Sequence, residues 1–268
     1  MVHEHRAELG DRSIRYLESG AGWPLILLHA FPLQAAMWTP QLERVPRGWR
    51  LIAPDIRGFG GTAAADGARP SMEDYAADLI GLLDALELDR AVIGGLSMGG
   101  YITFAMLRLA PERFSGVVLA DTRAQADTPE GRDNRRTLSE LVRTRGPAAV
   151  ADQMMPKLLG RTTRESRPEV KQEVRRLILS NDAAGIDGAI HAMLQRPDST
   201  AGLGRISVPT LVVTGDEDTL VPVADAEALQ RAIPRSQFVV LPRAGHLSSL
   251  ESPDDFSEAL RNFLLSNL

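Results

Sequence analysis

The sequence predicts an α/β fold, in which a mostly parallel β-sheet is covered by helices on both faces. Short, nearly continuous apolar runs alternate along the chain with segments of helical periodicity. Such a run is typical of a strand that is buried on both faces, as the strands of a parallel sheet are. The chain has 268 residues, of which 44% are hydrophobic, and it is long enough to bury such a sheet. Ligands of folds in this class bind at the carboxyl ends of the strands.

Eight strands are expected in this sheet. Two stretches of alternating polarity, residues 5–9 and 13–18, flank Gly10 and Asp11 and indicate an opening hairpin. The pattern then changes to apolar runs, which predict strands in a parallel arrangement. The six runs span residues 25–29, 51–54, 91–96, 116–120, 210–214 and 237–241.

Two of the predicted helices have clear starts. One runs from residue 72 to about residue 88, with Ser71 as its N-cap and Asp74 three positions later. The last helix begins after Ser252 and carries Pro253 in its first turn. Each has an apolar stripe at helical spacing, formed by Met72, Tyr75, Ala76, Leu79, Leu83 and Leu86 in the first and by Phe256, Leu260 and Phe263 in the last.

Residues 125–205, here called the helical segment, interrupt the alternation of strands and helices. They show helical periodicity without a strand pattern, and they are too many for a plain crossover. We therefore expect a core domain of residues 1–124 and 206–268, with residues 125–205 inserted as a helical cap. Candidate helices within the segment span residues 135–146, 148–159, 168–180 and 183–194.

Composition excludes several classes of function. The net charge is −5, with 30 Lys and Arg scattered among 35 Asp and Glu, so a nucleic acid partner is not expected. The absence of cysteine removes disulfides, thiolate nucleophiles and cysteine-bound zinc. The N-terminus is polar and the apolar run at residues 25–28 is too short to span a bilayer, so we expect a cytoplasmic protein without a membrane partner.

A G-x-S-x-G motif surrounds Ser97. The run Gly95-Leu96-Ser97-Met98-Gly99 follows an apolar stretch directly and precedes a helical stretch at residues 101–109. This is the strand, sharp turn and helix that the motif requires to present a nucleophilic serine. The alternative is a glycine-rich turn with an incidental serine, because short motifs also arise by chance.

With this motif, the chain resembles the α/β-hydrolase family. Other motifs follow in the family's order: HAFP at residues 29–32, DIRGFG at 55–60, GDED at 215–218 before Pro222, and AGH at 244–246. The resemblance covers nearly the whole chain. Within the family it is most similar to small cap-bearing esterases, 3-oxoadipate enol-lactonases and cofactor-free haloperoxidases.

A serine hydroxyl needs a base to become a nucleophile, and histidine is suited to this role near neutral pH. Of the five histidines, His3 and His5 lie in the polar terminus and His29 ends a strand. His191 lies in the helical segment, where a packed or pocket-lining role is expected. His246 follows the last strand on a glycine-containing loop, and we expect it to be the base and then the acid that protonates the leaving group.

The histidine in turn needs a carboxylate to fix its tautomer. Asp218 follows the strand at residues 210–214, so that serine, acid and histidine occur in the order of this fold. The resemblance assigns the acid to Asp218, four residues before Pro222. Asp121, at the end of the preceding strand, is the alternative, because some members of the family place the acid there.

The tetrahedral intermediate needs hydrogen bond donors for its oxyanion. The motif's geometry offers the backbone N–H of Met98, and the resemblance implies the N–H of Phe31 as the second donor. The chain has Ala30 where the family usually has glycine after His29. A Cβ at this position could displace the loop.

A mainly apolar substrate pocket is expected under the cap. Arg123, near the start of the helical segment, is a candidate partner for a substrate carboxylate, with solvent exposure as the alternative. The other candidate pocket residues are Trp38, Met154, Leu158, His191, Leu220 and Leu247.

The predicted function is hydrolysis of a small to medium carboxylic ester or lactone through an acyl-serine intermediate. No metal or organic cofactor is expected. Cofactor-free perhydrolysis or halogenation at the same three residues is an alternative, and a small-molecule receptor with slow turnover is another of a different class. Ser97 disfavours dehalogenation and epoxide hydrolysis, which need a carboxylate nucleophile. The sequence predicts neither an oligomeric state nor the natural substrate.

Overall fold

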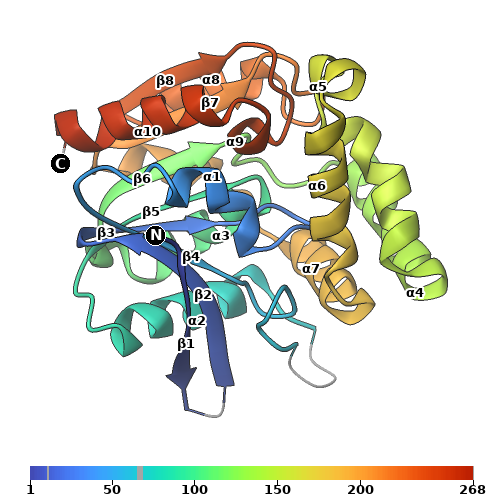
Figure 1. Cartoon of the computed structure of the whole chain (residues 1–268), viewed down its shortest axis with the longest axis horizontal. Helices are drawn as coiled ribbons and strands as arrows, with labels where there is room; N and C mark the ends of the chain where they lie inside the picture. The colour runs from blue at the N-terminus through green and yellow to red at the C-terminus, as the bar shows by residue number, and fades with distance from the viewer. Residues whose placement is uncertain (11, 65–68, 268) are drawn as a thin grey trace.

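The computed structural model describes residues 1–10, 12–64 and 69–267, and its described part is built around one eight-stranded sheet (Figure 1). The strand order is β1-β2-β4-β3-β5-β6-β7-β8. The first two pairings, β1 with β2 and β2 with β4, are antiparallel, and the remaining pairings are parallel. The strands span His3–Leu9 (β1), Arg12–Gly20 (β2), Gly22–Leu28 (β3), Gly48–Pro54 (β4), Ala91–Leu96 (β5), Phe114–Ala120 (β6), Thr210–Gly215 (β7) and Ser236–Leu241 (β8).

The predicted α/β class and the mostly parallel sheet are confirmed. The opening hairpin forms as β1 and β2, although Asp11 in its expected turn lies outside the described residues. The first parallel strand begins at Gly22 rather than at residue 25, and β4 begins at Gly48 rather than at residue 51. The added residues, 22–24 and 48–50, include polar or exposed ones, so the search for apolar runs did not assign them to the strands.

Helices cover both faces of the sheet. Successive side chains of a strand point to opposite faces, so a strand that is apolar throughout needs packing partners on both. In β3, Ile26 and Leu28 pack with one set of helices, whereas Leu25 and Leu27 pack with the other. The first set consists of α2 (Met72–Ala85), α3 (Met98–Leu109) and α8 (Val223–Ala232). The second consists of η1 (Ala35–Trp38), α1 (Thr39–Leu42), α9 (Ser248–Glu251) and α10 (Pro253–Asn267).

The expected start of α2 is observed in detail. Ser71 Oγ accepts a hydrogen bond from Asp74 N at 3.1 Å, and Asp74 Oδ2 accepts one from Ser71 N at 2.8 Å. These two bonds satisfy amides that the first turn of a helix cannot pair internally. The helix ends at Ala85, three residues before its predicted end.

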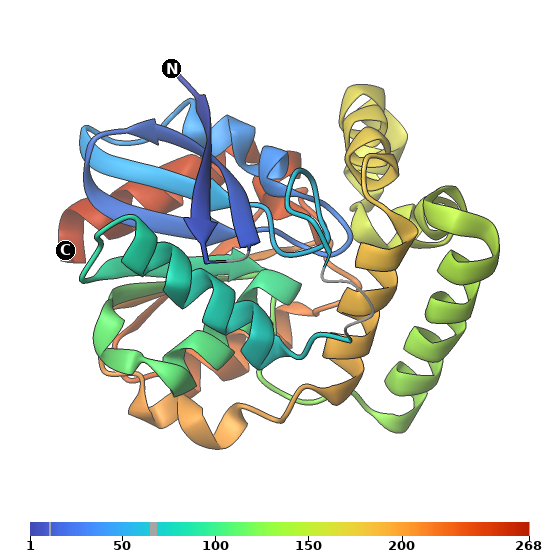
Figure 2. The ribbon, with the colours of Figure 1, turned by 90° about the horizontal axis from the view of Figure 1, so that it is seen from below.

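The helical segment lies at one side of the sheet, beside the carboxyl ends of its parallel strands (Figures 1 and 2). The predicted helices 135–146 and 148–159 are one element, α4, which bends at Gly146, a glycine with φ 73° and ψ −177°. A glycine adopts this conformation without the strain that other residues incur. The segment contains α4 (Pro129–Leu158), α5 (Arg161–Ser166), α6 (Pro168–Leu179), α7 (Ala183–Gln195) and η3 (Thr200–Arg205). Outside it, η2 (Pro111–Arg113) precedes β6.

Candidate active site

Ser97 occupies a sharp turn between β5 and α3. Its φ of 56° and ψ of −110° are strained for a residue with a side chain. The neighbouring glycines allow this turn, because a Cβ on Gly95 would lie 2.4 Å from the carbonyl carbon of Gly99. Ser97 N donates to the carbonyl of Ala120 at 2.9 Å, and Thr122 Oγ1 donates to the carbonyl of Ser97 at 2.8 Å. The turn is therefore fixed to the end of β6.

A hydrogen-bonded chain connects Ser97, His246 and Asp218. His246 Nε2 lies 2.8 Å from Ser97 Oγ, and its Nδ1 lies 2.7 Å from Asp218 Oδ2. A carboxylate only accepts hydrogen bonds, so Nδ1–H is the donor and Nε2 is left to accept from the serine hydroxyl. Asp218 Oδ1 is held in turn by the amides of Leu220 at 2.8 Å and Val221 at 3.0 Å.

The surroundings of His246 favour its protonated form. The ring is buried, which by itself lowers the pKa of His246. The charge of Asp218 and its hydrogen bond outweigh burial, and the pKa of His246 is raised above its ordinary value. The arrangement can thus accept a proton at Nε2 and stabilise the resulting imidazolium.

Asp121 lies near these residues with different partners. Its side chain is buried, Oδ1 accepts from the amide of Gly215 at 3.0 Å, and Oδ2 accepts from the hydroxyl of Ser248. Burial raises the pKa of Asp121 well above its ordinary value, and the charge of Asp218 raises it further. Within the described residues, the carboxylate that bonds to His246 is that of Asp218.

Phe31 and Met98 have backbone amides with no hydrogen bond acceptor within the described part of the chain. Met98 is the first residue of α3, where helical amides have no internal partner. Phe31 precedes Pro32 through a cis peptide bond. Ala30 is fully buried and lies outside the left-handed region, so the alanine that replaces the family's glycine is not strained.

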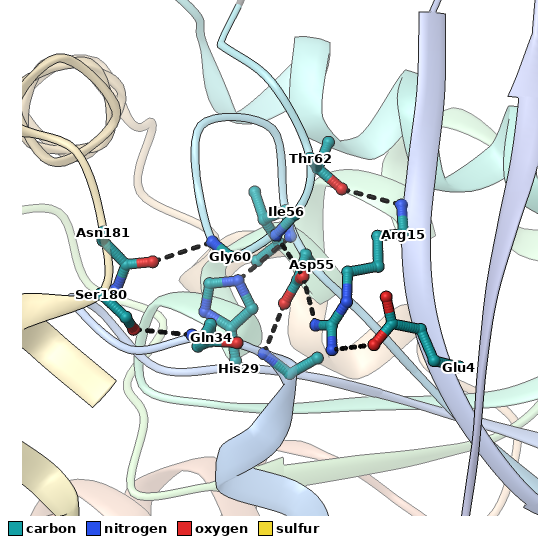
Figure 3. A network of polar contacts seen from close by, with 12 residues as sticks. Glu4, Arg15, His29, Gln34, Asp55, Ile56, Gly60, Thr62, Ser180 and Asn181 are labelled. Carbon is teal, nitrogen blue, oxygen red and sulfur yellow. Dashed lines mark hydrogen bonds and ion pairs between the residues drawn. The ribbon is translucent and has the colours of Figure 1, made fainter. Parts of the chain in front are cut away.

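His29 has a structural position. Its Nδ1–H donates to the carbonyl of Ala30 at 3.0 Å, and its Nε2 accepts from the amide of Ile56 at 3.1 Å (Figure 3). Burial lowers the pKa of His29 and keeps the ring neutral. The ring thereby connects the loops that follow β3 and β4.

Two further side chains in Figure 3 hold the same loops in place. Asp55 is buried and accepts from the amides of Ala35 and Gly61, both at 2.8 Å, and from Arg15 at 2.7 Å. Asn181, between α6 and α7, donates to the carbonyl of Pro32 at 2.9 Å and accepts from the amide of Gly60 at 2.8 Å. The role of Asn181 was missed by the sequence reasoning, since it depends on contacts between residues about 150 positions apart.

The candidate pocket residues lie in several places. Trp38 is fully buried and its ring packs on Phe256 of α10, with 5.7 Å between centroids. Leu158 and Leu247 are fully buried on the same face, and Met154 and Leu220 are partly buried against it. His191 lines a cavity of about 200 Å³ between α7 and the loop that contains Arg57.

Arg123 belongs to an ionic cluster around Asp127. Its guanidinium lies 3.6 Å from Asp127 Oδ1, and Arg196 lies 2.9 Å from the same oxygen. Arg135 contacts the other oxygen, and Arg196 also stacks on Tyr101, 3.9 Å from the ring centroid. Burial alone would raise the pKa of Asp127, but the arginines lower it. The cluster joins the two connections of the helical segment, and only Arg123 was singled out from the sequence.

The fold and the strand, turn and helix around Ser97 define an α/β hydrolase. Residues 24–253 match the family model of the alpha/beta hydrolase fold, and the chain belongs to this family. The resemblance stated from the sequence motifs is therefore confirmed. Among the described residues, no group of three His, Asp or Glu side chains could hold a metal ion, and no helix is long and apolar enough to cross a membrane.

Three similar proteins cover almost the whole chain. An esterase from Thermogutta terrifontis, solved with malate bound, is 41% identical with a TM-score of 0.93, over 98% of each chain. The 3-oxoadipate enol-lactonase 2 of Acinetobacter baylyi is 29% identical over 88% of this chain and 86% of its own. A Synechocystis protein with the provisional name non-heme chloroperoxidase is 30% identical over 94% of both chains.

Proposed function

We propose that this hydrolase cleaves a small to medium carboxylic ester or lactone through an acyl-serine intermediate. The observation that carries the proposal is the hydrogen-bonded chain from Ser97 through His246 to Asp218. Action on ester bonds agrees with the similarity to an esterase and to an enol-lactonase. The three side chains would act as nucleophile, base and orienting carboxylate.

In the first half of the reaction, Ser97 Oγ attacks the substrate carbonyl carbon while its proton passes to His246 Nε2. The carbonyl electrons move onto oxygen, and the amides of Phe31 and Met98 are the proposed donors to this oxyanion. When the carbonyl re-forms, the bond to the alkoxide breaks and His246 donates its proton to that oxygen. In a lactone, the released hydroxyl remains attached to the acyl chain.

In the second half, water attacks the acyl-serine and gives its proton to His246. The second tetrahedral intermediate collapses, the proton returns to Ser97 Oγ, and the carboxylic acid leaves. Asp218 accepts the hydrogen bond from His246 Nδ1–H and stabilises the imidazolium in both halves.

The helical segment is the proposed cap over this site. Its helices lie beside the carboxyl ends of the parallel strands (Figure 2). Ser97 directly follows Leu96, the last residue of β5, and is therefore at the same edge of the sheet. We propose residues 125–205 as the cap and residues 1–124 and 206–268 as the core domain. Met154 and Leu220, the apolar members of the predicted pocket that are only partly buried, are the proposed contacts to a substrate.

Peroxide-dependent chemistry at the same residues is the second candidate. It is favoured by the similarity to the Synechocystis protein with a chloroperoxidase name. Hydrogen peroxide would replace water in the attack on the acyl-serine and yield a peracid, without a metal.

The test combines labelling and turnover. A fluorophosphonate probe should modify Ser97, as located by mass spectrometry, and Ser97→Ala should lower kcat on accepted esters by about four or more powers of ten. Ser266→Ala, at an exposed site on α10, is the control and should retain activity. Labelling at another residue, or full activity of Ser97→Ala, would refute the mechanism. Acyl esters of graded length and simple lactones, assayed beside peroxide-dependent bromination, separate the two candidates.

A further inference from the structure

Glu251 lies next to the loop that carries His246. Its side chain is fully buried at the end of α9. Oε1 accepts a hydrogen bond from the amide of Leu247 at 3.1 Å, and Oε2 accepts one from the amide of Gly160 at 2.8 Å. One carboxylate therefore connects the residue after His246 with the turn between α4 and α5.

The turn and the histidine loop are in direct backbone contact. A Cβ on Gly245 would lie 2.1 Å from the amide nitrogen of Gly160, and a Cβ on Gly160 would lie 2.8 Å from that of Gly245. The two glycines thus leave no space between the segments. A displacement of this turn would move the backbone on either side of His246.

The acid loop is tied to the same turn. Glu217, the neighbour of Asp218, accepts from the amide and the hydroxyl of Thr162, both at 2.7 Å, and lies 3.7 Å from Arg161. The turn at residues 159–162 therefore contacts both loops that position the proposed acid and base.

The charged groups that act on His246 are carboxylates. Asp218, Asp121 and Glu251 all raise the pKa of His246. Arg167 approaches Glu251 through the backbone carbonyl rather than the carboxylate. Burial raises the pKa of Glu251, although the amides that it binds oppose this effect. A buried charge is costly unless it is paired, and the imidazolium formed during catalysis would provide a partner.

We propose that Glu251 is a positioning residue for His246, which fixes the histidine loop against the α4–α5 turn and adds negative charge near the ring. The proposal rests on the assignment of His246 as the base. Glu251 does not touch the substrate or the reacting atoms; it acts through the backbone of Leu247 and through its field.

Glu251→Gln tests both parts of this role. The amide retains one acceptor but places an NH₂ group against a backbone N–H, so His246 should lose its alignment. We expect kcat to fall about 10- to 100-fold with KM changed less than about threefold. Loss of the charge should lower the pKa of His246, and because the base acts when neutral, the acid limb of kcat/KM should move to lower pH by about half a unit. Glu258→Gln, at an exposed site on α10, is the matched control and should match the unmodified protein.

Glu251→Asp separates position from charge. It keeps the charge with a shorter reach, so kcat should fall while the acid limb stays within about 0.2 units of its original pH. It also replaces Glu251→Gln if the latter does not fold. Unchanged kcat in either variant, or a loss of kcat without the pH shift in Glu251→Gln, would overturn the proposal. Fluorophosphonate labelling of the unmodified protein is scored separately: if Ser97 is not labelled, it is the proposed mechanism that fails.

Discussion

Asp218 Oδ2 and His246 Nδ1 lie 2.7 Å apart in a buried contact, whereas Asp121 bonds to Ser248 and Gly215. Asp218→Asn should therefore lower kcat by about three to four powers of ten, because an amide cannot hold the required tautomer. Asp121→Asn should have a much smaller effect on kcat. Both are measured by steady-state kinetics on one ester, and the reverse order would move the acid to Asp121.

The raised pKa of His246 sets the pH dependence of the proposed reaction. The base must be neutral to accept the proton of Ser97, so activity is lost as the pH falls through the pKa of His246. Because Asp218 raises this pKa above the ordinary 6.5, the midpoint of the acid limb of kcat/KM should lie above pH 6.5. A pH profile with a substrate that does not ionise measures the midpoint. A value below 6.5 would contradict the charge environment described for His246.

Asn181 should affect catalysis although it lies in the helical segment. Asn181→Ala removes the donor to the Pro32 carbonyl and the acceptor of the Gly60 amide. The loop that carries Phe31 should then be less well placed, and we expect kcat to fall about 10-fold, with about 2 kcal/mol of stability lost. Asn134→Ala, at an exposed site on α4, is the control. Equal kcat in the two variants would show that this bond does not position the loop.

Asp127 should matter for stability. Its buried carboxylate is the ionic partner of the buried Arg196, and removal of one member of a buried pair costs about 3 to 5 kcal/mol. Asp127→Asn should lower the free energy of unfolding by this order. The pKa of Asp127 is lowered in the folded protein. The difference in stability between the unmodified protein and Asp127→Asn should therefore be largest above the ordinary pKa of 3.8. It should shrink as the pH falls below 3.8 and through the pKa of Asp127 in the folded protein. Urea unfolding at pH 7 and at pH 3 measures both; an equal difference at the two pH values would argue against the ion pair.

Much of the fold follows from local patterns in the sequence. The apolar runs predict the parallel strands because burial on both faces leaves no polar alternation, and the break at Gly146 is visible as Gly146-Pro147. The helix α5 was missed, since six residues are too few to show helical periodicity. The first residues of β3 and β4 were missed because the backbone pairing of these strands begins in exposed residues, before the apolar runs start.

Some residues of the candidate site can likewise be predicted from local patterns in the sequence, and others cannot. Ser97, Asp218 and His246 stand beside glycines and prolines that mark sharp turns after strands, and these three side chains meet in the structure. Glu251 and Asn181 have no such signal. Each bonds to a backbone group that is remote in the chain, Gly160 for Glu251 and Pro32 for Asn181, and a single sequence does not reveal such a pairing.

The contact between Gly160 and Gly245 has a consequence for protein engineering. Exchanging the helices at residues 125–205 for those of another hydrolase is an obvious route to a new substrate range. A chimera made at those boundaries would replace Gly160 and Thr162. It would keep their contact partners: Gly245 and Glu251, which contact Gly160, and Glu217, which accepts from Thr162. Any larger residue grafted at position 160 would push against the histidine loop. Successful grafts should therefore keep the turn at residues 159–162 from the recipient and exchange only the helices on either side.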